Sequence, residues 1–285
     1  MRGVKRMGRT YRAKNGVTED VRFTVPMSAK PRTKERAAST PRKQEQNRNQ
    51  AVHILGRILN NNFEQGDILL TLEYSWSEKK HLEIRTRERI GDGRIKKQDL
   101  EDAMLSESDR DADLFLRRCK EAGLSRVAKR VVIASDRDGD TGKQAENHVH
   151  IVLSGESFSL IGKKLTLNGK TLESIWGKGP VQYEFLRSGP LNKLAAYLIR
   201  QTRTIANRKK YRCSRSIERI IPEEYEIDPD ADTGIHVPAG AEILERQENA
   251  ESKYHMQYVR YLPRKQKSGP KAPRESQRKG GRRNE

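Results

Sequence analysis

The sequence predicts an α+β protein with one main folded domain between two basic, disordered ends. Apolar residues at helical spacing alternate along the middle of the chain with short, dense apolar runs that are typical of buried strands. The excess of Lys and Arg is concentrated at the two ends. No apolar run approaches the roughly 18 residues needed to span a bilayer, so a membrane-spanning protein is excluded.

The first half of the middle region predicts a helix, a strand and a second helix. Residues 52–63 place their apolar side chains at helical spacing, and residues 68–74 are rich enough in Ile, Leu and Thr to form a buried strand. Residues 111–121 begin with acids, end with bases and are followed by Gly123. That charge order complements a helix dipole, so a helix is expected there.

The second half predicts a hairpin and further short elements. The runs RVVIASD (130–136) and NHVHIVLS (147–154) flank the turn-rich segment RDGDTGKQAE, so an antiparallel hairpin is expected. Four more elements are expected, namely a short helix over 172–176, a strand over 181–185, a helix over 191–204 and a strand over 254–262.

Charge divides the chain into four regions. The whole chain holds 58 Lys and Arg against 39 Asp and Glu, a net charge of +19. Residues 1–50 carry a net +10 and residues 263–285 a net +7, and both are rich in Pro, Gly, Ser and Gln, which predicts disordered basic tails. We therefore expect a folded domain over 51–221, followed over 222–262 by an acidic loop and a C-terminal strand.

The composition also indicates partners and compartment. Basic arms bind nucleic acid through release of counterions, whereas the alternative is a solvated tail that only aids solubility. The basic N-terminus is not followed by an apolar segment, which argues against a secretory signal. The two cysteines, Cys119 and Cys213, cannot build a disulfide framework or a metal knuckle by themselves. A reducing, cytoplasmic setting is expected.

Two histidines on one strand predict a metal site. His148 and His150 are two residues apart, so on a strand both imidazoles point to the same face and can converge on one divalent cation. The alternative is a pair of imidazoles satisfied by hydrogen bonds. Either Asp136, at the end of the neighbouring strand, or Glu146, two residues before His148, can supply a third ligand. Two imidazoles and a carboxylate suit Mg²⁺ or Mn²⁺, which polarises a phosphate.

A tyrosine on the helix over 191–204 is a candidate nucleophile. The apolar stripe of this helix leaves Lys193, Tyr197 and Arg200 on the opposite face. A phenol between two cations can attack a phosphorus atom, and the cations stabilise the charge that develops. The alternative is a boundary tyrosine packed along aliphatic stems. A candidate phosphate-binding strip follows the helix, with Arg203, Arg208, Lys209, Lys210 and Arg212.

The order of these motifs resembles the rolling-circle replication initiators of bacteriophages and plasmids, in the HUH endonuclease superfamily. The resemblance covers roughly residues 50–220 and rests on six segments, TLEY (71–74), FLRRCK (115–120), HVHIVL (148–153), SIWGKGPV (174–181), LAAYLIRQ (194–201) and CSRSI (213–217). It implies a ferredoxin-like or RRM-like α+β fold with a central antiparallel sheet, in which the histidine strand is central and the tyrosine helix packs nearby.

The resemblance also implies an activity. It implies metal-dependent nicking and rejoining of single-stranded DNA at an origin hairpin, with the enzyme left on the 5′ end through a phosphotyrosyl bond. His148 and His150 match the metal-binding pair, and Tyr197 matches the nucleophile. Arg200 stands where the family more often has lysine, and no second tyrosine lies four residues after Tyr197. A single-nucleophile mechanism is therefore expected.

Three further expectations follow from these comparisons of motifs. Family members usually take an acid from the strand before the histidine strand, which favours Asp136 over Glu146 as the third ligand. The sequence holds no G-x-x-x-x-G-K-[ST] motif, so a host helicase and the replication machinery of a bacterial cell are expected partners. The alternatives to a replication initiator are a non-catalytic DNA- or RNA-binding protein, or a relaxase or transposase of the same superfamily.

Overall fold

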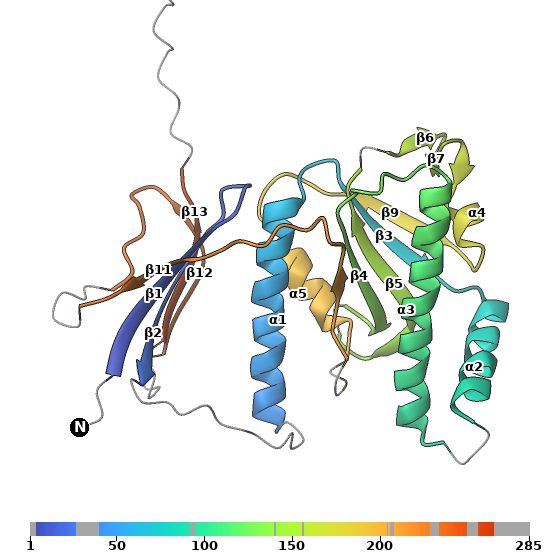
Figure 1. Cartoon of the computed structure of the whole chain (residues 1–285), viewed down its shortest axis with the longest axis horizontal. Helices are drawn as coiled ribbons and strands as arrows, with labels where there is room; N and C mark the ends of the chain where they lie inside the picture. The colour runs from blue at the N-terminus through green and yellow to red at the C-terminus, as the bar shows by residue number, and fades with distance from the viewer. Residues whose placement is uncertain are drawn as a thin grey trace, which may run out of the picture.

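The computed structural model describes residues 4–26, 40–91, 95–139, 141–155, 157–203, 205, 208–228, 234–249 and 256–264. These residues form helices and antiparallel sheets, so the predicted α+β class is confirmed. Figure 1 shows the order of the layers, with one sheet at the left, helix α1 in the middle and a second sheet at the right.

The sheet at the right, here called the main sheet, has the strand order β10-β4-β5-β3-β9. All its neighbouring strands are antiparallel, and β5 lies in the centre between β4 and β3. The predicted hairpin is confirmed as β4 and β5. The five strands are β3 (Ile68–Glu73), β4 (Arg130–Arg137), β5 (Gln144–Leu153), β9 (Val181–Phe185) and β10 (Arg212–Cys213).

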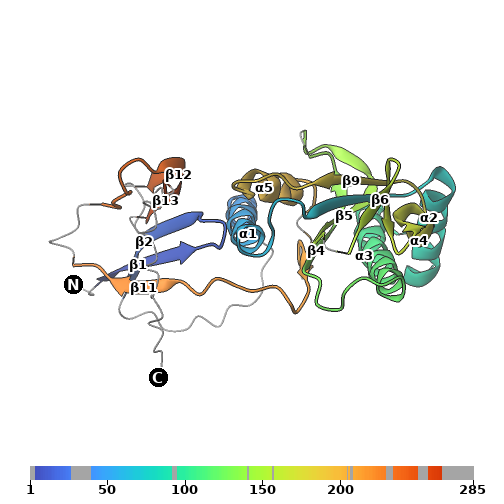
Figure 2. The same cartoon turned by 90° about the horizontal axis from the view of Figure 1, so that it is seen from above.

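Helices cover both faces of the main sheet because its strands alternate apolar side chains to either side. Leu70 and Ile151 point into the core beneath α3, whereas Leu69 and Val152 point into the core beneath α1 and α5. Figure 2 shows these helices on opposite sides of the sheet. The helices are α1 (Pro41–Asn62), α2 (Trp76–Ile90), α3 (Lys97–Glu121), α4 (Leu172–Trp176) and α5 (Asn192–Arg200).

A small three-stranded sheet lies beside α4. It has the order β6-β7-β8 and buries Leu165 and Leu167 of its central strand in the core beneath α3. Its strands are β6 (Ser159–Ile161), β7 (Lys164–Leu167) and β8 (Lys170–Thr171).

The two ends of the chain build another sheet, here called the terminal sheet, with the order β11-β1-β2-β13-β12. This corrects the expectation that residues 1–50 are a disordered arm, because Val4–Arg12 and Thr18–Pro26 form a hairpin and α1 already begins at Pro41. The five strands are β1 (Val4–Arg12), β2 (Thr18–Pro26), β11 (Glu223–Glu226), β12 (Glu242–Asn249) and β13 (Met256–Leu262).

The terminal sheet pairs the basic N-terminus with the segment expected to be an acidic loop. Strand β11 pairs antiparallel with β1, and its acids form ion pairs with basic side chains of β1. These pairs are Arg9–Glu224 at 2.7 Å, Lys5–Glu226 at 2.6 Å, and Arg12–Glu223. The predicted C-terminal strand is confirmed as β13, whereas β11 and β12 replace parts of the expected loop. Residues 265–285 of the predicted basic tail lie outside the described residues.

A buried ionic cluster attaches the terminal sheet to α1. Glu19 of β2 accepts from Arg260 of β13 at 2.9 Å and from Arg57 of α1 at 2.7 Å, and Glu19 and Arg260 are both buried. Removing one member of such a buried set leaves an uncompensated charge. The cluster therefore fixes the terminal sheet against the helix that also covers the main sheet.

Three helices differ from the predicted ranges. The helix expected over 52–63 begins eleven residues earlier, and α3 extends to Lys97 on its N-terminal side. Helix α5 ends at Arg200, which leaves the following basic segment outside it. Among the described residues, no helix is long and apolar enough to cross a membrane.

Candidate active site

His148 and His150 lie at the centre of the main sheet and face α5. In the register of β5, His150 stands opposite Thr71 of β3, and His148 stands opposite Glu73 of β3 and Ser135 of β4. Their strand face is shared with Val152, which packs in the core beneath α1 and α5. The predicted common orientation of the two imidazoles is therefore confirmed, and their ring centroids are 4.8 Å apart.

The histidines open into a cavity of about 970 Å³ between the main sheet and α5. Tyr197 and Lys193 of α5 line one side, and Thr71 and Glu73 of β3 line another. The first turns of α2 contribute Lys79 to the same cavity. The cavity therefore combines imidazoles, a phenol, a carboxylate and ammonium groups.

Hydrogen bonds hold both rings at Nδ1. His148 Nδ1 lies 2.8 Å from the Glu146 carbonyl oxygen, which can only accept, so Nδ1 is the donor. His150 Nδ1 lies 3.1 Å from Thr71 Oγ1. Burial, together with the neighbouring His148, lowers the pKa of His150 to about 4, so this ring is neutral at neutral pH.

Gln201, at the C-terminal end of α5, completes a set of three converging ligand atoms. His148 Nε2 lies 3.1 Å from His150 Nε2 and 2.9 Å from Gln201 Oε1. Ligands held about 2.1 Å from an octahedral cation stand about 3.0 Å from each other at right angles. The distances from His148 Nε2 to His150 Nε2 and to Gln201 Oε1 therefore match the spacing of neighbouring ligands of a divalent cation.

Tyr197 lies one helical turn before Gln201 on the same face of α5. Its ring centroid is 6.1 Å from that of His150, and 38% of its surface is exposed to solvent. Because residues four apart on a helix are neighbours, one short helix presents both the phenol and the amide to the histidines. The predicted nucleophile is thus placed beside the predicted metal-binding pair.

The loop between β4 and β5 packs tightly against Tyr197. A Cβ atom added to Gly139 would overlap carbon atoms of the Tyr197 ring, so only glycine allows this approach. Arg200 Nη1 donates to the Gly139 carbonyl oxygen at 3.2 Å. Arg200 therefore holds the loop against the ring, while Lys193, the other cation predicted beside Tyr197, lines the cavity.

Asp136 does not join the histidines, which corrects its assignment as the third ligand. It is buried, and its Oδ2 lies 2.6 Å from Arg203 Nε. Strand β4 is irregular between Ser135 and Arg137, and the backbone N–H groups of Asp136 and Arg137 both donate to the Gln201 carbonyl oxygen. This segment therefore positions Gln201 through its backbone and pairs its carboxylate with Arg203.

The second candidate acid also has another partner. Glu146 is exposed and forms an ion pair with Lys79. No group of three or more His, Cys, Asp and Glu side chains that could hold a metal ion occurs in the described part of the chain. Gln201 Oε1, which lies 2.9 Å from His148 Nε2, is therefore the candidate third ligand that the structure offers.

Most of the predicted phosphate-binding strip lies away from the cavity. Three of its arginines pair with acids of α3, in Arg203–Glu101 at 2.9 Å, Arg208–Asp109 at 2.9 Å and Arg212–Asp113 at 2.7 Å. Burial, with Arg48 and Arg208 nearby, lowers the pKa of Lys210 to about 8. Neither Lys209 nor Lys210 is among the residues that line the cavity. These arginines fasten the segment after α5 to α3.

Two functional candidates were missed in the sequence. Gln201 could have been found from its spacing, because it lies four residues after Tyr197 and shares its face of the helix. Glu73 lies on the strand that pairs with the histidine strand, directly opposite His148. Its Oε1 accepts from Gln182 Nε2 at 2.9 Å. The register that reveals Glu73 depends on long-range pairing, which no local pattern contains.

Comparisons with known proteins do not assign the chain to a family. The chain matches no family model, no curated protein and no solved structure. The function is therefore argued from the geometry of the cavity.

Proposed function

We propose that this chain is a metal-dependent endonuclease of the HUH type that nicks and rejoins single-stranded DNA to start rolling-circle replication. The observation that carries the proposal is the convergence of His148, His150 and Gln201 beside Tyr197. A pair of structural histidines requires neither a tyrosine beside it nor a third acceptor atom facing it. The central position of β5 supports the ferredoxin-like or RRM-like fold that this proposal includes.

His148, His150 and Gln201 would hold one Mg²⁺ or Mn²⁺ ion. When bound, such an ion withdraws electron density from a phosphate and stabilises the charge that develops during its attack. The lowered pKa of His150 suits this role, because a neutral imidazole keeps its lone pair for a ligand.

Tyr197 would attack the scissile phosphorus atom. The bond between Tyr197 Oη and phosphorus forms as the bond between phosphorus and the 3′ oxygen breaks. The phenolic proton leaves to solvent, and a second proton reaches the departing 3′ oxygen. One phosphate ester replaces another, so the reverse reaction rejoins the strand without an external energy source.

Lys193 would contact the phosphate during this exchange. It lies one turn before Tyr197 on α5 and lines the same cavity. Its ammonium group attracts the DNA backbone and offsets negative charge. An origin hairpin, a host helicase and the bacterial replication machinery remain the proposed partners.

Covalent trapping tests the proposal. The full chain is mixed with a pool of single-stranded oligonucleotides and Mn²⁺, and the products are separated on a denaturing protein gel. Label at the 3′ end should move onto the protein, while label at the 5′ end should appear in a shortened free fragment. Tyr197→Phe should lower the adduct by at least about 10³-fold, because only the attacking oxygen is lost.

Tyr183→Phe is the matched control for this experiment. Tyr183 also lines the cavity, but its hydroxyl group donates to the Lys163 carbonyl oxygen at 3.1 Å. This variant should form the adduct like the wild type. Absence of any adduct from a wild-type protein that binds the oligonucleotides would contradict the proposal and favour a non-catalytic DNA-binding protein.

A further inference from the structure

Trp76 stands exposed at the start of α2, three residues before Lys79, which lines the cavity of the candidate active site. Its exposed fraction is 71%, although tryptophan is seldom so accessible in a folded protein. The other tryptophan, Trp176, is fully buried. Lys80, one turn further along α2, places its Nζ 3.5 Å from the centroid of the Trp76 ring. This cation covers one face of the indole and restricts its orientation.

Trp76 lies between residues that line the cavity. Tyr74 and Lys79 both belong to the cavity wall, and Lys79 also pairs with Glu146 at the start of β5. On a helix, positions 76, 79 and 80 lie on one side, so Trp76 projects beside the ammonium groups of Lys79 and Lys80. Trp76 itself does not line the cavity, but Lys79, on the same side of α2, does.

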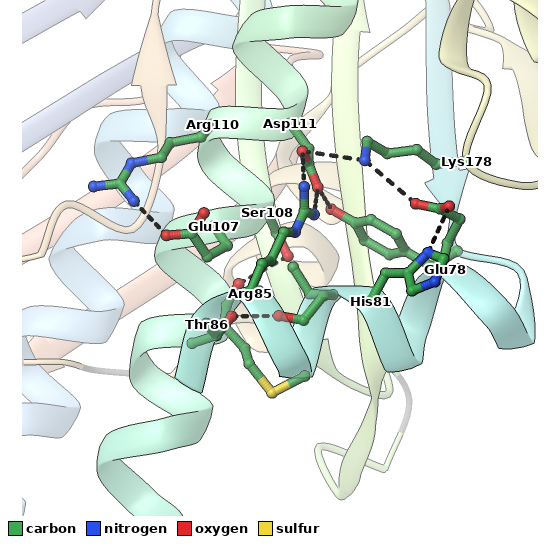
Figure 3. A network of polar contacts seen from close by, with 12 residues as sticks. Glu78, His81, Arg85, Thr86, Glu107, Ser108, Arg110, Asp111 and Lys178 are labelled. Atoms are coloured by element: carbon green, nitrogen blue, oxygen red, sulfur yellow. Dashed lines mark hydrogen bonds and ion pairs between the residues drawn. The ribbon is translucent and has the colours of Figure 1, made fainter. Parts of the chain in front are cut away.

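The start of α2 is firmly anchored. Lys178 Nζ bridges Glu78 of α2 at 3.3 Å and Asp111 of α3 at 3.5 Å, as Figure 3 shows. Asp111 also accepts from Arg85 and from Tyr74, whose hydroxyl group lies 2.9 Å away. This network fixes α2, and with it the backbone of Trp76, on α3.

We propose that Trp76 and Lys80 form a stacking site for a nucleobase of the single-stranded DNA that enters the cavity. The inference rests on the proposed function and names the contact that guides its substrate. Every base has a π-face, so stacking on an aromatic ring holds a strand without reading its sequence. Lys79 and Lys80 attract the phosphates on either side of the stacked base.

Tryptophan fluorescence tests this contact directly, because one tryptophan is exposed and the other is buried. A short oligodeoxythymidylate is added to the full chain with a chelator present, so no cleavage occurs. Binding of the oligonucleotide should quench the fluorescence of Trp76. The same titration of Trp76→Phe should show no quenching, because only the buried Trp176 remains. Trp76→Ala should weaken binding about tenfold. The slope of affinity against salt should be unchanged in this variant, since no charge is removed.

Ile84→Ala is the matched control, because Ile84 is a second exposed apolar residue of α2, 53% accessible. It should bind the oligonucleotide like the wild type. Wild-type affinity of Trp76→Ala, with no quenching in the parent protein, would overturn the inference. A protein-docking role for this helix face would instead make both variants lose a protein partner while leaving DNA affinity intact.

The covalent assay separates this inference from the proposed function. At saturating DNA, Trp76→Ala should still form the adduct at the wild-type level, because Trp76 does not touch the reacting atoms. Adduct formation with unchanged DNA affinity in Trp76→Ala would reject the stacking site alone. Quenching of Trp76 by DNA without any adduct would reject the nuclease and keep the stacking site.

Discussion

At the scale of single residues, the candidate site depends on one amide that replaces an expected carboxylate. Gln201 Oε1 faces His148 Nε2 at 2.9 Å, while Asp136 is committed to Arg203. Burial raises the pKa of Asp136, and the charge of Arg203 opposes that effect. In the proposed metal site, a neutral amide makes the ligand set less negative than a carboxylate would, which favours completion of the site by phosphate oxygens of a substrate.

This assignment predicts how Mn²⁺ affinity responds to substitution. Gln201→Leu should weaken Mn²⁺ binding about 10- to 100-fold by removing a ligand atom, and Gln201→Glu should retain binding because it keeps an oxygen there. Calorimetric titration measures both, with His148→Ala as the reference for loss.

Asp136→Asn is the matched test at Asp136, the residue that the sequence favoured as the third metal ligand. Its Mn²⁺ affinity should equal that of the wild type, while its free energy of unfolding should fall by about 2 kcal/mol, because a buried charge-assisted contact to Arg203 is lost. A large loss of Mn²⁺ affinity in Asp136→Asn, with none in Gln201→Leu, would restore the carboxylate as the ligand.

At the scale of helices and strands, local patterns located the elements that have strong apolar periodicity. The hairpin of β4 and β5 and helix α4 follow the sequence closely, because each buries several apolar residues. Strand β9 has the predicted bounds although none of its residues is fully buried. Helix α2 was missed because only Leu82 and Thr86 of its residues are buried, and its stability depends on the contacts of Asp111 with Arg85. Polar anchoring of this kind leaves no periodic signal.

The junction between β13 and α1 contains a histidine that predicts a pH dependence. Arg260 donates to His53 Nδ1 at 2.9 Å, so this ring accepts there and is neutral. Burial, followed by the charge of Arg260, lowers the pKa of His53, while Glu245 and Glu19 oppose this effect. The junction therefore favours the unprotonated ring.

Stability should consequently fall as the pH drops below the ordinary histidine pKa of about 6.5. There the unfolded chain takes up a proton that the folded chain does not, so acid favours unfolding. Thermal melting at about pH 7 and about pH 5 should show a larger fall for the wild type than for His53→Gln, whose amide can still accept from Arg260. Equal falls in the two proteins would mean that His53 does not couple to folding.

At the scale of the whole molecule, the charged segments of the sequence form paired strands, although their composition had predicted a disordered arm and a loop. Considered alone, the basic N-terminus suggested a disordered arm and the acidic segment after residue 222 suggested a loop. They are neighbouring strands, and Arg9 of β1 pairs with Glu224 of β11. The pairing joins segments 215 residues apart, a separation that no window along the sequence can detect.

Truncation of the two ends should therefore have unequal effects. A chain that begins at Thr40 lacks β1 and β2, which separate β11 from β13 in the terminal sheet. It also leaves the buried Arg260 without Glu19, a loss that costs about 3–5 kcal/mol in comparable buried pairs. Limited proteolysis should cut this variant within residues 223–264, whereas a chain that ends at Arg264 should resist like the full protein. Equal resistance of both truncated chains would contradict this account.

Because β2 pairs with β13, the two large sheets must form in a fixed order during translation. Every strand of the main sheet has been made once Cys213 has emerged, so that sheet can form while translation continues. The ion pair of Glu19 with Arg260 cannot form until Arg260, 241 residues later in the chain, has been made. During that interval the nascent N-terminal hairpin lacks its partner strand. Among the described sheets, the terminal sheet is consequently the last to be completed, and its closure requires a chain that has been translated through β13.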